Sequence, residues 1–261
     1  MTERTNRPLS LVVPCYNEAR RLNVDAFRDF LAGAEGVHVL FVDDGSSDDT
    51  AAVLEEVRRG YEFCADILRC GKNGGKAEAV RLGFLHALAN FQPAIIGFWD
   101  ADLATPLELL GHLRQVTELE PQIEMVFGAR VKLLGRHVER RAVRHYLGRI
   151  FATVVSSMLN LAIYDSQCGA KLFRVGPHTR EIFAEPFLSK WVFDVEIVAR
   201  YLALYGGDPK RLEKAIFEYP LEAWTDIAGS KVHPKDFLTA LIDILRIRRK
   251  YLGESTVQTR Q

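Results

Sequence analysis

Five short apolar runs, each ending in polar or charged residues, dominate the first half of the chain. They cover residues 9–13, 37–42, 67–70, 94–99 and 123–127 and have the composition of buried strands. Helical segments separate them, for example residues 77–88. Strands that alternate with helices at this spacing predict an α/β fold, a mostly parallel sheet with helices on both faces. The carboxyl ends of parallel strands meet at one edge of the sheet, where ligands bind.

The composition limits the kind of protein. With 261 residues, 48% of them hydrophobic, the chain can bury a large core, and we expect a single domain over residues 1–252 with a flexible tail at 253–261. Lysine plus arginine equals aspartate plus glutamate at 34 each, so the net charge favours no nucleic-acid partner. The four cysteines show no metal-ligand spacing and are typical of reduced thiols in a cytoplasmic protein.

No segment has the pattern of a signal peptide or of a membrane span. Residues 1–8 are polar, and the longest uncharged apolar run, 150–164, is shorter than the ~20 residues that a spanning helix needs. Two basic amphipathic segments, 140–163 and 235–252, indicate contact with an anionic membrane surface. The second carries Arg246, Arg248, Arg249 and Lys250. The alternative is a pair of core-packing helices with solvated basic ends.

The second half departs from the regular alternation. We expect a helix over residues 142–163, a strand at 171–175, a helix at 193–204, a strand at 215–219, a polar loop at 224–233 and a closing helix at 235–252.

Two carboxylates, Asp100 and Asp102, follow the apolar run 95–99 without an intervening turn. Side chains alternate along an extended chain, so both carboxylates share a face at the end of the strand. Hard oxygen donors suit Mg²⁺ or Mn²⁺, which bind one or two protein carboxylates and take further ligands from phosphate and water. A plain solvated turn is the alternative, because Asp is common after strands.

The remaining strand ends bring carboxylates and cations to the same edge: Asn17 and Glu18, Asp43 and Asp44, Lys72 and Lys76, and Arg130. This combination suits a metal–diphosphate ligand, because the carboxylates hold the metal while metal and cations neutralise phosphate. Asp44 is suited to accept hydrogen bonds from a base or ribose. For Asp43 we favour a turn-shaping role, and for Lys76 the alternative is a solvated helix N-terminus.

Other nucleotide-binding classes lack their motifs here. The glycine-rich loop 71–76 does not have the spacing of a P-loop, and no G-x-G-x-x-G follows the first strand. These observations disfavour a nucleoside-triphosphate hydrolase and a nicotinamide-dependent dehydrogenase. A nucleotidyltransferase would need a basic glycine-rich loop directly after the first strand, and residues 14–18 do not form one.

Six motifs resemble a known family. The sequences LVVPCYNE at 11–18, VDDGSSD at 42–48 and DAD at 100–102 resemble the family 2 glycosyltransferases of the GT-A fold. Residues 165–173, 191–196 and 224–231 are similar to the dolichyl-phosphate β-glucosyltransferase branch, which is related to the dolichyl-phosphate mannose synthases. The resemblance covers residues 9–252.

The resemblance implies an inverting transfer of a sugar, glucose, from a nucleotide diphosphate sugar, UDP-glucose, to a polyprenyl phosphate at the cytosolic membrane face. Residues 9–130 would form the nucleotide-binding half and 131–252 the half that faces acceptor and membrane. The implied nucleotide-sugar ligands are Pro14, Tyr16, Asn17, Glu18, Asp44, Lys76, Asp100 and Ala101. Asp102, with Asp100, would hold the Mg²⁺ or Mn²⁺ ion. Arg130 would meet the diphosphate or the acceptor phosphate, and Lys231 would close over it.

The chemistry depends on the acceptor. A phosphate acceptor is already an anion, so the enzyme needs to position it and to stabilise the leaving diphosphate. A soluble hydroxyl acceptor would need a base, for which Asp194 is the candidate; otherwise Asp194 is a structural carboxylate at a helix start. A non-catalytic nucleotide-sugar-binding protein is the alternative from another class, but the intact Asp102 and Arg130 argue against it.

Two positions depart from the pattern of the family. Mannose synthases usually have Gln where this chain has Ala104, which makes mannose a less suitable sugar. Ala170 replaces a common Phe, which alters the acceptor pocket.

Overall fold

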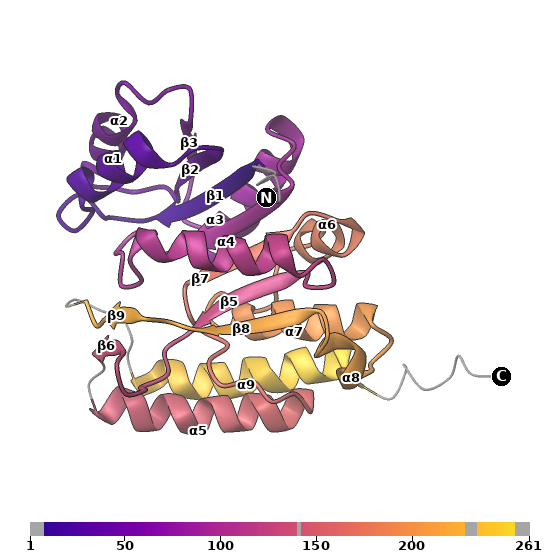
Figure 1. Cartoon of the computed structure of the whole chain (residues 1–261). Coiled ribbons are helices and arrows are strands. Elements are labelled where there is room, and N and C mark those ends of the chain that lie inside the picture. Colours follow the sequence, from indigo (N-terminus) through magenta and orange to yellow (C-terminus); the bar gives the residue numbers. More distant parts are fainter. Residues whose placement is uncertain (1–7, 140–141, 228–233, 254–261) are drawn as a thin grey trace.

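The computed structural model describes residues 8–139, 142–227 and 234–253. Its centre is a seven-stranded sheet with the strand order β3-β2-β1-β4-β7-β5-β8 (Figure 1). The strands are β1 (Leu9–Cys15), β2 (Val37–Asp43), β3 (Ala65–Arg69), β4 (Ile95–Trp99), β5 (Met125–Ala129), β7 (Ala170–Arg174) and β8 (Ile216–Pro220).

The sheet is mostly parallel, as predicted. β1 pairs in parallel with β2 and β4, β2 with β3, and β5 with β8. β7 alone runs the other way, antiparallel to both β4 and β5. The ends of β1, β2, β4 and β5 therefore share one edge with the beginning of β7.

Helices cover both faces of the sheet, which confirms the predicted α/β architecture. One face carries α1 (Val24–Gly33), α2 (Thr50–Arg58) and α4 (Leu110–Leu119), whose buried residues belong to one hydrophobic cluster. The other face carries α3 (Lys76–Asn90), α5 (Ala142–Leu159), α6 (Pro177–Ala184), α7 (Phe193–Leu204), α8 (Pro209–Leu212) and α9 (Pro234–Tyr251). α5 and α9 both pack against α7, on the side of the molecule away from α1 and α2 (Figure 1).

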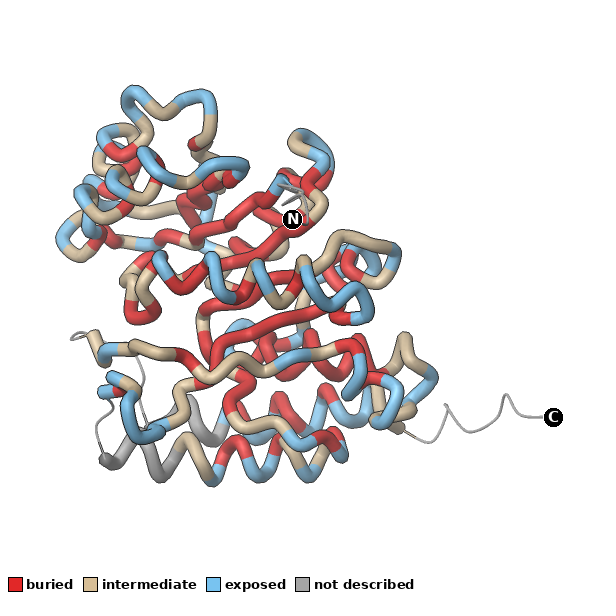
Figure 2. The backbone as a smooth tube through the Cα atoms, in the orientation of Figure 1, coloured by how far each residue is buried: buried red, intermediate tan, exposed pale blue. Residues whose placement is uncertain are grey.

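The two hydrophobic clusters follow from the alternation of side chains along each strand. In β4, Ile96 and Phe98 point into the cluster under α3 and α7, whereas Ile95 and Trp99 point into the cluster under α1 and α4. All four side chains are fully buried. Figure 2 shows that the buried segments concentrate in the sheet and on the inner sides of the helices.

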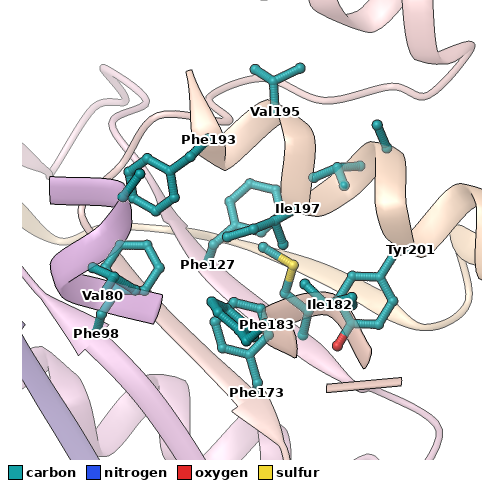
Figure 3. Packing of buried hydrophobic residues seen from close by; sticks show 14 of the residues in the cluster. Val80, Phe98, Phe127, Phe173, Ile182, Phe183, Phe193, Val195, Ile197 and Tyr201 are labelled. Atoms are coloured by element: carbon teal, nitrogen blue, oxygen red, sulfur yellow. The ribbon is translucent and has the colours of Figure 1, made fainter. Parts of the chain in front are cut away.

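Aromatic rings fill the cluster on the α7 side (Figure 3). Phe84 stacks on Phe183 with ring centroids 3.9 Å apart and meets Phe173 edge-on at 5.5 Å. Phe98 lies 5.7 Å from Phe193, the first residue of α7. These contacts hold α3, α6 and α7 against the sheet. The N-termini of α3 and α7 lie near the edge at which β1, β2, β4 and β5 end and β7 begins, which we call the active edge.

Several expected elements differ in the structure. Part of the loop expected at 224–233 forms a short strand, β9 (Ala223–Thr225), paired with β6 (His137–Glu139), and neither strand was predicted. The helix expected at 142–163 ends at Leu159, where Asn160 adopts a positive φ of 52° that ends a helix. The short α6 and α8 were also missed. α7 matches its predicted bounds.

The helix α2 begins after Asp49, which occupies the N-cap position without a side-chain capping hydrogen bond. The Asp48 carboxylate accepts hydrogen bonds from the backbone N and the hydroxyl of Thr50. Among the described residues, no helix combines the length and the apolar character needed to cross a bilayer.

Candidate functional site

A cleft of about 440 Å³ opens at the active edge, where β1, β2 and β4 end and α3 begins. It is lined by most of the residues that the sequence placed there: Pro14, Tyr16, Glu18, Asp44, Lys76, Asp100, Ala101 and Asp102. The lining also includes Arg21, Asn73 and Trp191, which were not predicted as site residues. The cleft thus combines carboxylates, cations and aromatic surface, the mixture that a nucleotide diphosphate requires.

The two carboxylates after β4 have different surroundings. Oδ1 of Asp100 lies 2.5 Å from Nζ of Lys76. Oδ1 of Asp102 accepts a hydrogen bond from the backbone N of Ala104 at 3.1 Å. Burial and the charge of Asp100 both raise the pKa of Asp102 above its usual value. A positive charge in addition to that of Lys76 would offset the repulsion between the carboxylates of Asp100 and Asp102.

The donor set fits a Mg²⁺ or Mn²⁺ ion that completes its shell with phosphate and water. Among the described residues no group of three or more His, Cys, Asp or Glu side chains could hold a metal by itself. The residues that could hold such an ion together with a substrate phosphate are Asp100 and Asp102. A hard cation that keeps part of its shell for the substrate matches two carboxylates of this kind.

Lys76 begins α3 and follows the glycine-rich loop. Burial lowers its pKa, but the carboxylates of Asp100 and Asp194 outweigh that effect and raise it. Lys76 therefore keeps its positive charge inside the cleft, where it is suited to meet phosphate oxygens.

Asp44 is buried and joins β2 to the glycine-rich loop. Its two carboxylate oxygens accept hydrogen bonds from the backbone N atoms of Gly74, at 2.8 Å, and Gly75, at 2.7 Å. Burial raises the pKa of Asp44, although these two hydrogen bonds oppose the shift. The neighbouring Asp43 accepts a hydrogen bond from the backbone N of Ser46 at 3.0 Å, which confirms its turn-shaping role.

The loop after β1 is held by hydrogen bonds to the loop after β2 and by an ion pair between its own residues. Asn17 was expected to bind the nucleotide sugar, but its side chain is turned to the loop after β2, where Oδ1 accepts a hydrogen bond from Ser47 at 2.9 Å. Asn17 has a positive φ of 53°, and the following residue, Glu18, lines the cleft. Glu18 receives two hydrogen bonds from Arg21, at 2.6 and 2.9 Å. The signal for Arg21 in the sequence is its place three residues after Glu18.

Arg130, at the end of β5, is held in a fork. The Nε and Nη2 atoms of Arg130 donate hydrogen bonds to the carboxylate of Asp165 at 2.5 and 2.7 Å. The same carboxylate accepts a hydrogen bond from the backbone N of Arg130. The guanidinium carbon lies 5.3 Å from the ring of Trp224. Burial opposes the charge on Arg130, but Asp165 outweighs it and raises the pKa of the guanidinium. The sequence did not identify Asp165 as its partner, because 35 residues separate the two.

The other two predicted catalytic residues have different outcomes. Asp194 lies in the first turn of α7, is buried, and has Oδ1 2.8 Å from Nζ of Lys171. Lys231 lies outside the described residues, as do residues 254–261 of the predicted tail.

Trp191 enters the cleft from the segment before α7, and its side chain is half-exposed. Ser189 holds this segment: its hydroxyl accepts hydrogen bonds from the backbone N of Trp191 and Val192 and donates to Asp243 of α9 at 2.7 Å. The sequence signal for Trp191 was its place in the motif at 191–196, to which no role had been assigned.

Comparison with known proteins agrees with this geometry. Residues 10–179 match the model of the family "Glycosyl transferase family 2". The dolichyl-phosphate β-glucosyltransferase of Dictyostelium discoideum is 31% identical over 94% of this chain and 75% of its own length. The human dolichyl-phosphate β-glucosyltransferase is 32% identical over 94% of this chain and 76% of its own length.

Solved structures share the fold. Mannosyl-3-phosphoglycerate synthase from Rubrobacter xylanophilus superposes with a TM-score of 0.67 at 18% identity, covering 98% of this chain and 77% of that one. Glucosyl-3-phosphoglycerate synthase from Mycobacterium tuberculosis, in a complex with Mn²⁺, UDP and glucosyl-3-phosphoglycerate, superposes with a TM-score of 0.63 at 19% identity, covering 95% and 80%. The fold is thus the GT-A fold. The chain belongs to glycosyl transferase family 2, in the group that contains the dolichyl-phosphate β-glucosyltransferases.

Proposed function

We propose that this glycosyltransferase transfers glucose from UDP-glucose to a polyprenyl phosphate at a membrane surface, with Mg²⁺ or Mn²⁺ as cofactor. The observation that carries the proposal is the convergence of Asp44, Lys76, Asp100 and Asp102 in one cleft. The identity of about 30% to dolichyl-phosphate β-glucosyltransferases, over 94% of the chain, supports glucose as the sugar and a polyprenyl phosphate as the acceptor class.

The donor would lie along the cleft with its base near Asp44 and its diphosphate near Lys76. Asp100 and Asp102 would hold the divalent cation, which supplies positive charge to the leaving diphosphate when it is bound. Lys76 adds a second cation whose position is set by Asp100. Tyr16 and Trp191 line the cleft as aromatic surface for base and sugar.

In the transfer, an oxygen of the acceptor phosphate attacks the anomeric carbon from the side opposite the leaving group. The new carbon–oxygen bond forms as the bond to the diphosphate breaks, and the electron pair leaves with UDP, so the configuration inverts. The acceptor oxygen is already charged, and no proton needs to be removed. Arg130 and Lys231 would hold the acceptor phosphate, with Asp165 keeping the Arg130 fork in place.

Contact with the membrane would come from the acceptor half. The outer side of α9 exposes Leu241, Ile242 and Leu245, next to the exposed Arg246. The loop after β5 exposes Leu133 and Leu134, and Leu134 is fully exposed. Apolar side chains beside basic ones suit an anionic lipid surface. This arrangement would bring the acceptor phosphate to the cleft while its lipid stays in the bilayer.

The test is turnover of UDP-glucose with Mn²⁺ or Mg²⁺, with and without a short-chain polyprenyl phosphate. We expect lipid-dependent release of UDP and recovery of glucose in the organic phase. Binding of UDP-glucose without lipid-dependent release would retain the donor site and reject the lipid acceptor. Release of UDP that is equally fast in EDTA would reject the metal.

A further inference from the structure

We propose that Lys171 and Asp194 are positioning residues for Lys76, and that this buried pair suits the site to an acceptor that arrives already charged. The inference rests on the proposed function and addresses its acceptor. It is carried by one arrangement: a completely buried lysine, paired with a buried aspartate, directly behind the cleft.

Lys171 is unusual because it lies in the central strand β7 with no exposed surface. Lysine is almost never fully buried unless it is paired. Its Nζ lies 2.8 Å from Oδ1 of Asp194 and donates a hydrogen bond to the carbonyl of Cys168. The rings of Phe98 and Phe127 lie 5.3 and 5.7 Å from the same ammonium group. Lys171 is therefore enclosed by one carboxylate, one carbonyl and two aromatic faces.

The ring of Phe98 lies between the buried pair and Lys76 of the cleft. Nζ of Lys76 lies 5.9 Å from the centre of the Phe98 ring, which Lys171 also approaches. Asp194 lies within electrostatic range of Lys76, on the side of that lysine away from solvent. Charges thus alternate in sign from the core to the cleft, in the order Lys171, Asp194, Lys76, Asp100.

Such an arrangement is poorly explained by stability alone. Two charges removed from water lose hydration, and apolar replacements of a buried ion pair are often neutral or stabilising. Another buried pair on α7, Glu196 with Arg200, has a visible structural task, because Arg200 donates hydrogen bonds to the carbonyls of residues 182, 185 and 186. The backbone partner of Lys171 is instead Cys168, next to the segment that contacts Asp100.

The same geometry disfavours Asp194 as a general base. A base must reach the proton that it removes. Asp194 is only 4% exposed, and its Oδ1 faces the Lys171 ammonium group. A hydroxyl acceptor would therefore find no available base at this position. A phosphate acceptor does not need one, and it benefits from a Lys76 held firmly beside the leaving diphosphate.

The test compares Lys171→Met, Asp194→Asn and the double variant Lys171→Met/Asp194→Asn, each with and without Lys76→Met. The single variants leave one buried charge unpaired, and we expect them to lower the melting temperature. The double variant removes both charges, and its melting temperature should return most of the way to that of the wild type. Its kcat with the polyprenyl phosphate should nevertheless stay about tenfold or more below wild type, with the KM for UDP-glucose within about twofold.

The Lys76→Met background separates positioning from general damage. If Lys171 and Asp194 act through Lys76, replacing both of them should cause no further loss of kcat in a protein that already carries Lys76→Met. Additive losses, or a double variant with wild-type kcat, would overturn the proposal. So would an enzyme that glucosylates a hydroxyl acceptor and loses that activity completely in Asp194→Asn.

A binding measurement distinguishes this proposal from the proposed function. UDP carries the charge that the diphosphate acquires when its bond to the sugar breaks. Its affinity in the presence of Mn²⁺ should fall to the same extent in Lys76→Met and in the double variant, whether or not the lipid acceptor is correct. Absence of lipid-dependent turnover in the wild type would reject the proposed function; unchanged UDP affinity in the double variant would reject the positioning role.

Discussion

The α-carbon of Gly169 lies directly against the carboxylate of Asp100: a methyl group at position 169 would overlap the carboxyl carbon and both of its oxygens. The backbone N of Asp100 also donates a hydrogen bond to the carbonyl of Gly169 at 3.0 Å. The carboxylate of Asp100 can occupy the active edge only because residue 169 has no side chain. Gly169 is therefore part of the site although it offers no functional group.

Replacing Gly169 by Ala should displace Asp100 and lower kcat on the order of 100-fold, because small misplacements of reacting groups have effects of that size. The matched control is Gly176→Ala, in an extended conformation with nothing within 4 Å of the added methyl group. Steady-state turnover and melting temperature of both variants check this prediction. Wild-type kcat in a folded Gly169→Ala variant would contradict it.

Asp102→Asn should abolish metal-dependent turnover while the fold remains intact, because the amide keeps the shape and removes the charge that a divalent cation needs. The control is Asp49→Asn, at the start of α2, whose carboxylate makes no capping hydrogen bond. Calorimetric titration with Mn²⁺ and UDP, together with turnover, measures the effect. A folded Asp102→Asn variant that keeps normal metal-dependent turnover would remove Asp102 from the metal site.

Gly83→Ala should destabilise the protein by about 1–3 kcal/mol through overpacking. The helix α3 approaches β1 and β2 so closely there that an added methyl group would lie 2.5 Å from Val12 and 2.9 Å from Val42. Gly111→Ala, in α4 with nothing within 4 Å, should instead stabilise by about 0.5–1 kcal/mol, because alanine is the better helix former. Urea unfolding of the two variants tests the pair, and equal midpoints would contradict the close packing of α3.

The double variant Leu133→Asn/Leu134→Asn should weaken binding to anionic vesicles without lowering the melting temperature, since Leu133 is about half exposed and Leu134 fully exposed. Leu119→Asn, at the exposed C-terminal end of α4, is the matched control and should bind as the wild type does. Co-sedimentation with vesicles in the absence of substrate measures this contact independently of catalysis. Equal binding by all three proteins would exclude the loop from the membrane contact.

Glu222 gives a pH-dependent prediction. Burial raises its pKa, but hydrogen bonds from Tyr219, His112 and Arg136 outweigh that effect and lower the pKa to about 2. A carboxylate with a lowered folded-state pKa stabilises above its unfolded value of about 4.3 and loses that contribution as the pH falls toward 2. Glu222→Gln should therefore lower the melting temperature at pH 7, and the difference should shrink as the pH is lowered from 5 to 2. A pH-independent difference would contradict this assignment.

Local patterns predicted most of the strands and helices, because these depend on residues close in sequence, and the parallel order inferred from them predicted that the strand ends meet. The runs before Asp44 and Asp102 are apolar and short, and the parallel arrangement then brings their ends into one cleft. Apart from the short helices α6 and α8, what escaped prediction depends on partners distant in the chain. The three-residue strands β6 and β9 form by pairing with each other, and the residues within each strand are too few to show a strand pattern.

The fork of Arg130 and the burial of Lys171 were missed for the same reason. The sequence identifies Arg130 as a cation at a strand end, but its partner Asp165 follows α5 and is therefore distant in the chain. Lys171 reads as one polar residue in an apolar strand, and only the position of α7 shows that it is paired with Asp194. The reversed direction of β7 lies behind both, since it brings the segment before the strand, and not the one after it, to the active edge.

The place of β7 also has a consequence for how the chain folds. β1, β2, β3 and β4 pair only among themselves until β7 joins β4, so residues 9–99 can assemble half of the sheet first. β5 has no such option, because both of its neighbours, β7 and β8, come later in the chain. Pairings over such separations close slowly. We therefore expect β5 to be the last central strand to gain protection from hydrogen exchange during refolding, only after residues 170–174 have been inserted beside it.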